Sequence, residues 1–288
     1  MSRKSLEVNM PSTLDIRPSP IAGQWYPANS QRLAESVDAY IAAAHLPTLD
    51  GEVIGVVAPH AGHRYSGPVA GYAFAALRGL QPEIVAVISP MHQPYYQPLL
   101  TSAHASYYTP LGNITIDREA LQSLDVLLRA ELDFGMTPVK SDTEHSLEIE
   151  LPFLQRALAG QFRLLPVMVR DQSSKVVRAL GGALAKVLQG RKAVLVASTD
   201  LSHFYSQTVA DKLDAELLRR VEAFDPEAVL SAEEEGVGFA CGRAALAAVL
   251  WAAKDLGATT VKVLKHATSG DVTGDYRQVV GYGAAVIY

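Results

Sequence analysis

Six short runs of apolar residues recur along the chain and predict buried β-strands. Most of these runs are continuous rather than alternating with polar residues, which is typical of strands covered on both faces of a largely parallel sheet. They occupy residues 53–58, 84–89, 164–169, 193–198, 261–265 and 279–287.

Longer segments with helical spacing lie between these runs. The clearest places Leu33, Val37, Tyr40 and Ile41 on one side of a helix over 30–44. The other predicted helices span 176–188, 209–224 and 241–256, and the tyrosine-containing segment 104–115 predicts a hairpin or a loop excursion. This alternation of strands and helices predicts a single-domain, three-layer α/β sandwich around a central, mostly parallel sheet.

Domain organisation follows from the same pattern. Residues 1–16 are polar and aperiodic and contain Pro11, so we expect a flexible leader there. Residues 17–288 contain no low-complexity linker, charge block or repeat, and we expect them to form one α/β domain.

Composition excludes several classes of protein. Hydrophobic residues make up 49% of the 288 and charged residues only 19%, which excludes a mostly disordered chain. With 25 Lys and Arg against 30 Asp and Glu, scattered along the chain, no basic surface for nucleic acid is indicated. The most apolar stretch, 244–253, is shorter than the roughly 20 residues of a membrane span. One cysteine and no signal-peptide pattern favour a reducing cytoplasm, without disulfides.

Histidines follow three of the predicted strands. His60 and His63 come after the run 53–58, His92 after 84–89, and Asp200 and His203 after 193–198. Ligands of open α/β sheets bind beyond the carboxyl ends of strands, so these imidazoles are expected at one rim. There they could hold a metal, move protons or activate a nucleophile. Alternatively, each could simply bond a backbone carbonyl in its loop.

The remaining histidines divide into two groups. His63 could share a helical face with His60, but it could equally be solvated or packed, and His45, His104 and His266 are expected to be structural or exposed. His145 differs, because it lies near the start of a predicted helix that Asp142 would cap. A neutral His145 there would suit hydrogen bonding to a substrate or to a group of a metal site.

Two further residues leave alternatives open. Asp200 could orient His203 in an acid–base pair, or it could cap a helix and leave His203 exposed. Cys241 could be buried filler, or a helix N-terminus and Arg243 could lower its pKa toward the thiolate that binds metals and attacks electrophiles.

Six motifs together resemble the Memo family, whose prokaryotic members are called AmmeMemoRadiSam system protein B. The resemblance runs from about residue 17 to 288. The motifs are AGQWYP (22–27), PHAGHRYSG (59–67), SPMH (89–92), EHSLEIELPFL (144–154), STDLSH (198–203) and CGR (241–243).

The resemblance implies a fold like that of class III extradiol dioxygenases, which hold non-haem Fe(II) with two histidines and a carboxylate. By motif position, His60 and His92 match the metal histidines and His203 the acid–base histidine. Cys241 takes the place of the carboxylate ligand, as in other Memo proteins, and His63 stands where tyrosine is common. A thiolate also accepts Cu or Zn, and beside activated dioxygen it is open to oxidation.

We therefore expect a metalloprotein, with Fe(II) first and Cu or Zn as alternatives, acting as a dioxygenase-type oxidoreductase on a small substrate, with aromatic compounds among the candidates. His203 and Asp200 would manage protons, and His145 would lie on the substrate side. A non-catalytic adaptor that binds a small molecule or peptide is the alternative. A Cys–His hydrolase ranks last, because no sequence feature places an imidazole against Cys241. The resemblance also implies AMMECR-type and radical-SAM proteins as partners.

Overall fold

A nine-stranded sheet forms the centre of the molecule in the computed structural model, which describes residues 15–288. In spatial order its strands run β10-β12-β2-β9-β3-β8-β4-β7, with β11 paired to β12. Their bounds are β2 Gly55–Ala58, β3 Ile84–Pro90, β4 Leu99–Ser102, β7 Thr137–Val139, β8 Arg163–Val169, β9 Ala193–Ser198, β10 His203–Tyr205, β11 Val261–Thr268 and β12 Val279–Ile287. A small second sheet contains β1 (Ile16–Arg17), β5 (Ser106–Thr109) and β6 (Gly112–Thr115).

The sheet is parallel at its centre and mostly antiparallel toward its edges. Strands β2, β9, β3 and β8 pair in parallel, as their continuous apolar runs predict. β12 is antiparallel to β2, β10 and β11, and β4 is antiparallel to β8, although β7 returns parallel to β4. The link between β11 and β12, residues 269–278, is shorter than the dozen or more residues that a parallel crossover needs. The mostly parallel sheet of the prediction is therefore a mixed sheet with a parallel core.

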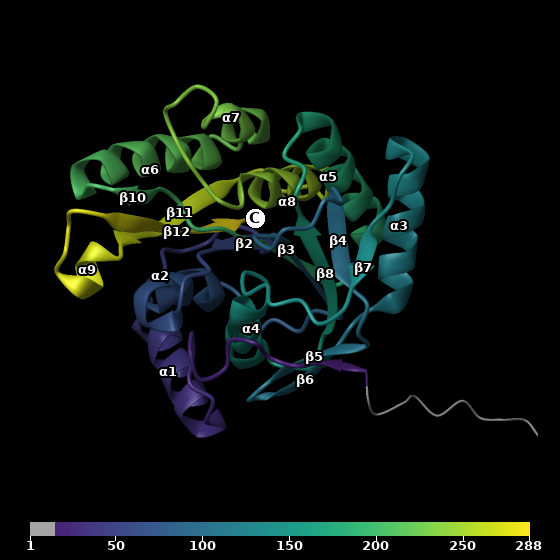
Figure 1. The fold of residues 1–288 in the computed structure, drawn as a ribbon, viewed down its shortest axis with the longest axis horizontal. Coiled ribbons are helices and arrows are strands. Elements are labelled where there is room, and N and C mark those ends of the chain that lie inside the picture. The colour runs from purple at the N-terminus through teal and green to yellow at the C-terminus, as the bar shows by residue number, and fades with distance from the viewer. Residues whose placement is uncertain (1–14) are drawn as a thin grey trace, which may run out of the picture.

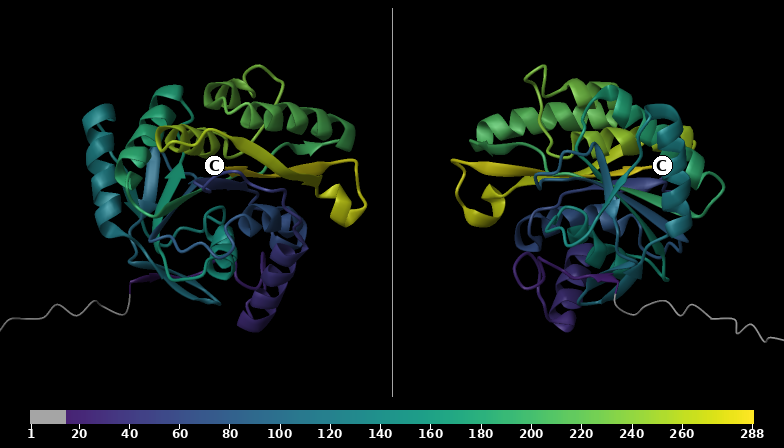
Figure 2. Two further views of the ribbon diagram at one scale, coloured as in Figure 1. Left: turned by 180° about the vertical axis from the view of Figure 1, so that it is seen from behind. Right: turned by 45° about the vertical axis from the view of Figure 1, so that its right-hand side comes forward.

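Helices cover both faces of the sheet and complete the predicted three-layer sandwich (Figure 1). One face carries α1 (Ser30–Ala43), α2 (His63–Ala75) and α4 (Leu151–Ala157). The other carries α5 (Ser174–Leu188), α6 (Gln207–Glu222), α7 (Pro226–Ser231) and α8 (Arg243–Asp255), with α3 (Arg118–Leu132) beside α5. The two further views in Figure 2 show the same layers, with the short α9 (Gly270–Thr273) at the end of the β11–β12 pair.

The Ala-rich helix α8 lies at the centre of its layer, against strands β2, β3, β8 and β9. Its small side chains allow close packing: a Cβ at Gly181 of α5 would meet Cβ of Trp251 at 2.7 Å and the carbonyl of Ala248 at 2.9 Å. The apolar stretch 244–253 is thus a buried core helix. Among residues 15–288, no helix has the length and apolar character needed to cross a membrane.

The helix predicted from Asp142 begins later than expected. A single 3₁₀ turn covers Glu148–Glu150, and α4 starts only at Leu151. Asp142 caps no helix, because its carboxylate binds the buried guanidinium of Arg17. The prediction of a helix opening at Asp142 was wrong because the segment 142–147 is held by this distant side chain.

Arg17 fastens the N-terminal strand β1 to that segment. Its guanidinium donates to Oδ1 of Asp142 at 2.7 Å, to Oε2 of Glu148 at 2.5 Å and to the carbonyl of Glu144 at 2.7 Å. Arg17 is 1% exposed, and both carboxylates are fully buried. Of the predicted leader, residues 1–14 lie outside the described residues, whereas Ile16 already belongs to β1.

Replacing Arg17 with Met should destabilise the protein by about 3–5 kcal/mol, because two buried carboxylates would lose their partner charge. Urea unfolding followed by circular dichroism measures this loss. Arg156→Met is the matched control, since its ion pair with Asp38 is about half exposed and should be worth at most about 1 kcal/mol. Equal losses in the two variants would contradict the role given to Arg17.

Candidate metal centre

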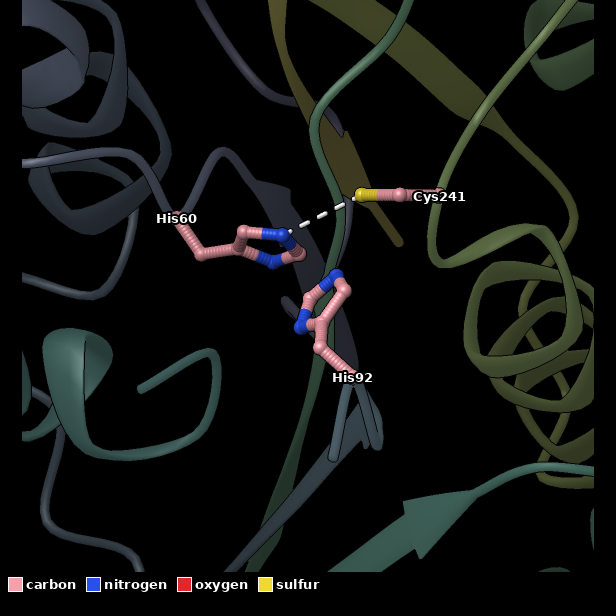
Figure 3. Close-up of side chains that lie close together, drawn as sticks. All are labelled: His60, His92 and Cys241. Carbon is pink, nitrogen blue, oxygen red and sulfur yellow. Dashed lines mark hydrogen bonds between the residues drawn. The ribbon is translucent and has the colours of Figure 1, made fainter. Parts of the chain in front are cut away.

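Three side chains from distant parts of the chain converge beyond the carboxyl ends of the central strands. His60 follows β2, His92 follows β3, and Cys241 precedes α8. One nitrogen of each histidine and the sulfur of Cys241 all lie within 4.8 Å of one another, and Figure 3 shows the three side chains pointing toward a common centre. β9 lies between β2 and β3, so the two histidines do not follow neighbouring strands, although their ring centroids are only 5.3 Å apart.

Hydrogen bonding fixes which nitrogen of His60 carries its proton. Oγ of Ser198 donates to the carbonyl of Ser146 at 2.6 Å, and it lies 2.9 Å from Nδ1 of His60. Because a carbonyl only accepts, the hydroxyl hydrogen of Ser198 is committed to it, and Nδ1 of His60 must donate to Oγ. Nε2 therefore keeps its lone pair, 3.1 Å from Sγ of Cys241. A neutral imidazole with a free Nε2 is the form that binds metals.

Glu144 orients the second histidine. Its Oε1 lies 2.9 Å from Nδ1 of His92, and its Oε2 accepts from the backbone nitrogen of His92 at 2.5 Å. Burial alone would raise the pKa of Glu144, but the hydrogen bond from His92 and the nearby imidazoles bring it well below its usual range. The sequence does not indicate this role of Glu144, because an acid at this position also fits the first turn of the helix predicted from Asp142.

His145 lies in the same layer of rings. Its ring is nearly parallel to that of His92, with centroids 4.9 Å apart, and Trp25 covers it at 4.1 Å. Burial lowers the pKa of His145 to about 4, so the ring is neutral at pH 7. Burial, rather than the helix N-terminus that the sequence suggested, keeps it neutral. His92, Glu144 and His145 also lie within 4.8 Å of one another, but there the carboxylate is already occupied by hydrogen bonds.

The environment of Cys241 bears on the two alternatives that the sequence left open. Cys241 is partly buried, and desolvation of its thiol, followed by the charge of Asp200, raises the pKa of the thiol well above the usual value. Arg243 cannot supply the opposite effect, because its guanidinium pairs with Glu233. These observations disfavour activation by Arg243 and the helix N-terminus, because the raised pKa favours the protonated thiol. A bound cation would reverse this preference, since coordination removes the thiol proton.

Asp200 and His203 do not form the expected pair. Oδ1 of Asp200 accepts from the backbone nitrogen of His60 at 2.7 Å, whereas Nδ1 of His203 lies 2.7 Å from the carbonyl of Leu201. Asp200 therefore positions the segment that carries His60 and does not orient His203. Burial raises the pKa of Asp200 to about 7. His203 begins β10 rather than a helix, and it lies outside the group formed by His60, His92 and Cys241.

The remaining histidines lie outside the candidate metal centre. His63 is buried in the first turn of α2, with Nε2 3.0 Å from the carbonyl of Ile149. His104 pairs with Asp15 and His266 with Asp214, while His45 is exposed.

Glu150 is a buried acid that the sequence pattern does not indicate. Glu150 is fully buried, and neither carboxylate oxygen has a hydrogen-bond partner among residues 15–288. Burial raises the pKa of Glu150 well above the usual value, the nearby hydroxyl of Ser198 lowers it, and the charge of Asp200 raises it further. The net shift favours the protonated form of this carboxyl group, close to the Ser198 hydroxyl that also contacts His60. Only the tertiary structure could reveal it, because an acid in the sequence EIELP fits an exposed helix start equally well.

Comparison with known proteins places this arrangement in a family. A family model described as "Memo-like protein" matches residues 17–286. The chain belongs to the Memo family. A MEMO1 family protein of Nitrosopumilus maritimus is 35% identical over 274 residues, covering 93% of this chain and 98% of the relative. One from Methanopyrus kandleri is 36% identical over 276 residues (92% and 96% covered), and one from Thermotoga maritima is 34% identical over 281 residues (93% and 98%). All six motifs of this Memo chain lie within the matched range.

Ser198→Ala should change the tautomer of His60, because Nδ1 would lose its acceptor while Nε2–H could still donate to Sγ of Cys241. The ¹⁵N chemical shifts of the His60 ring in metal-free protein would then report protonation at Nε2 instead of Nδ1. Ser202→Ala is the matched control, since the buried hydroxyl of Ser202 has no partner among the described residues. Unchanged ¹⁵N shifts in Ser198→Ala would contradict the assignment.

Proposed function

We propose that this Memo protein is a metalloprotein in which His60, His92 and Cys241 hold one transition-metal ion. Fe(II) is the first candidate, and Cu or Zn are the alternatives. The observation that carries the proposal is the convergence of these three donors around a His60 ring whose Nε2 lone pair faces the thiol. Bound iron would supply activation of dioxygen for oxidation of a small substrate, the chemistry implied by the resemblance to class III extradiol dioxygenases.

The donor set suits such an ion. Two imidazoles and one thiolate are ligands that iron, copper and zinc all accept, whereas Mg²⁺ and Ca²⁺ prefer oxygen. Each histidine is also held through its other ring nitrogen, His60 by Ser198 and His92 by Glu144. Groups that hold the second nitrogen in this way are typical of metal-binding histidines.

The surrounding residues would handle substrate and protons. Nδ1 of His203 is hydrogen-bonded to the carbonyl of Leu201, so Nε2 is the nitrogen that would exchange a proton with a ligand. Asp200 is a second candidate proton carrier, although it acts from beside His60 rather than through His203. His145, stacked between Trp25 and His92, lies where it could contact a substrate.

One distance favours the alternative of a Cys–His hydrolase, and it could not be inferred from the sequence. Sγ of Cys241 lies 3.1 Å from Nε2 of His60, which is the spacing of a nucleophile and its base. Burial, however, raises the pKa of Cys241, so the reactive thiolate is disfavoured. The pair is better suited to sharing a metal ion, whose charge would stabilise that thiolate.

The metal content of protein purified without oxygen tests the proposal. The wild type should contain about one equivalent of metal, Cys241→Ala should lose most of it, and His203→Ala should retain it because three ligands remain. His203→Ala should still lose most turnover, since acid–base assistance is typically worth about 10²- to 10⁴-fold.

Two outcomes would overturn these assignments. If His203→Ala empties the site and Cys241→Ala does not, the third ligand and the proton carrier have been exchanged. Protein that is free of metal after growth in metal-replete medium, yet still binds small molecules or peptides, would favour the adaptor.

Removing the metal with EDTA should leave the protein folded, with a fall of only a few degrees in melting temperature. The ligands lie beyond the ends of strands whose own residues are buried without any metal, and a core of this size folds alone. Circular dichroism and calorimetry before and after chelation measure the effect. Global unfolding on chelation would show that the ion has a structural role instead.

A further inference from the structure

Asp214 of α6 is a fully buried carboxylate that lies outside the candidate metal centre. Its Oδ1 accepts from the backbone nitrogen of Ser202 at 2.9 Å, and its Oδ2 lies 2.9 Å from Nε2 of His266. Because an ionised carboxylate only accepts, Nε2 of His266 carries the ring proton. α6 packs against β10, β11 and β12, so this one side chain joins the residue before β10 to a residue of β11 (Figure 1).

Gly281 of β12 leaves the space that this carboxylate occupies. A Cβ at Gly281 would lie 2.6 Å from Cγ of Asp214, closer than two carbons approach without a bond. Gly281 also forms two backbone hydrogen bonds of 2.8 Å with the segment before β10, donating to Ser202 and accepting from Leu201. Of the two backbone nitrogens in this segment, that of Leu201 therefore bonds β12 and that of Ser202 bonds Asp214.

The same segment orients the ring of His203. Nδ1 of His203 lies 2.7 Å from the carbonyl of Leu201, and because a carbonyl only accepts, Nδ1 carries the proton. The carbonyl of Leu201 and the N–H of Ser202 belong to one planar peptide group. Asp214 holds the N–H side of this group and His203 bonds its carbonyl side, so the direction of one hydrogen bond sets the direction of the other.

Charge links Asp214 to His203 as well. Burial lowers the pKa of His203, and the charge of His92 adds to this fall. The carbonyl of Leu201 and the charge of Asp214 act in the opposite direction, and the net shift remains downward. Asp214 therefore acts on His203 both through the peptide group and through its negative charge.

We propose that Asp214 is a positioning residue for His203, because it fixes the peptide group of Leu201 and Ser202 whose carbonyl orients the imidazole. His266 keeps the carboxylate turned toward that peptide group. The functional meaning rests on the proposed role of His203 as a proton carrier, since this orientation leaves Nε2 as the nitrogen that exchanges a proton. The hydrogen bonds themselves need neither a metal nor turnover.

The ¹⁵N chemical shifts of the histidine rings in metal-free, full-length protein test the proposal. In the wild type, His203 should carry its proton at Nδ1 and His266 at Nε2. Asp214→Ala removes the acceptor of the Ser202 nitrogen, so His203 should lose Nδ1–H as its major tautomer. Asp214→Asn should retain it, because an amide oxygen still accepts from Ser202. The amide NH₂ would then donate to Nε2 of His266, whose proton should move to Nδ1.

Replacements of His266 test the second half of the arrangement at a side chain that is 29% exposed. His266→Leu leaves Oδ2 of Asp214 without its donor and frees the carboxylate to turn, so the Nδ1–H form of His203 should be partly lost. His266→Gln supplies an amide donor and should restore the wild-type shifts of His203. If Asp214→Ala does not fold, this pair decides the proposal.

Asp211→Ala is the control, because it removes an exposed carboxylate of the same helix that accepts from the side chain of Gln207. It should leave both histidine rings unchanged. The proposal is refuted if His203 keeps its wild-type shifts in Asp214→Ala, or if Asp214→Asn loses the tautomer as completely as Asp214→Ala. An equal loss in Asp211→Ala would also refute it, and unchanged shifts in His266→Leu would refute the part given to His266. These measurements do not depend on metal content, whereas the turnover of His203→Ala tests the proposed function separately.

Discussion

Parallel pairing of β2, β9 and β3 is the constraint on which the site depends. Ala58 of β2 pairs with Ser198 of β9, and Ala197 of β9 pairs with Ile88 of β3, so all three strands end at one level of the sheet. The residues that follow them must therefore meet at one rim. His60 and His92 arrive from the outer two strands, and the middle strand ends in Ser198, whose hydroxyl lies against Nδ1 of His60.

Besides the strand ends, a segment with little regular structure contributes side chains to the site. Residues 142–147 carry Glu144 to His92 and His145 to Trp25, and they are held in place by Arg17 from the far N-terminal strand. An irregular segment near the core needs partners for its polar groups, and buried charges need partner charges. Arg17 supplies both, through a backbone carbonyl and two carboxylates. Helix α8 closes the arrangement, because Cys241 lies just before its first turn.

Burial dominates the electrostatics of this region. It lowers the pKa of His60 and His145 and raises those of Cys241, Asp200 and Glu150, so each group shifts toward its neutral form. Glu144 is the exception, because several donors hold its negative charge. The lowered pKa values of His60 and His145, the raised pKa of Cys241 and the negative charge of Glu144 all favour an added cation, whose charge would stabilise the thiolate.

Hydrophobic runs and motif positions in the sequence determined the α/β class, the parallel core strands and the gathering of His60, His92 and His203 near strand ends, because burial on two faces leaves a local pattern. The local pattern gave wrong or ambiguous predictions for side chains whose hydrogen-bond partners lie far away in the sequence. The sequence predicts a helix cap at Asp142, but its carboxylate binds Arg17. The sequence leaves open whether Asp200 orients His203 and whether Cys241 is activated. In the structure Asp200 accepts from the backbone of His60, and desolvation raises the pKa of Cys241. Strand order, the tautomer of His60 and the burial of Glu150 were decided only by tertiary structure. Each depends on contacts between distant segments and on exclusion of water, and neither quantity is encoded in the spacing of neighbouring residues.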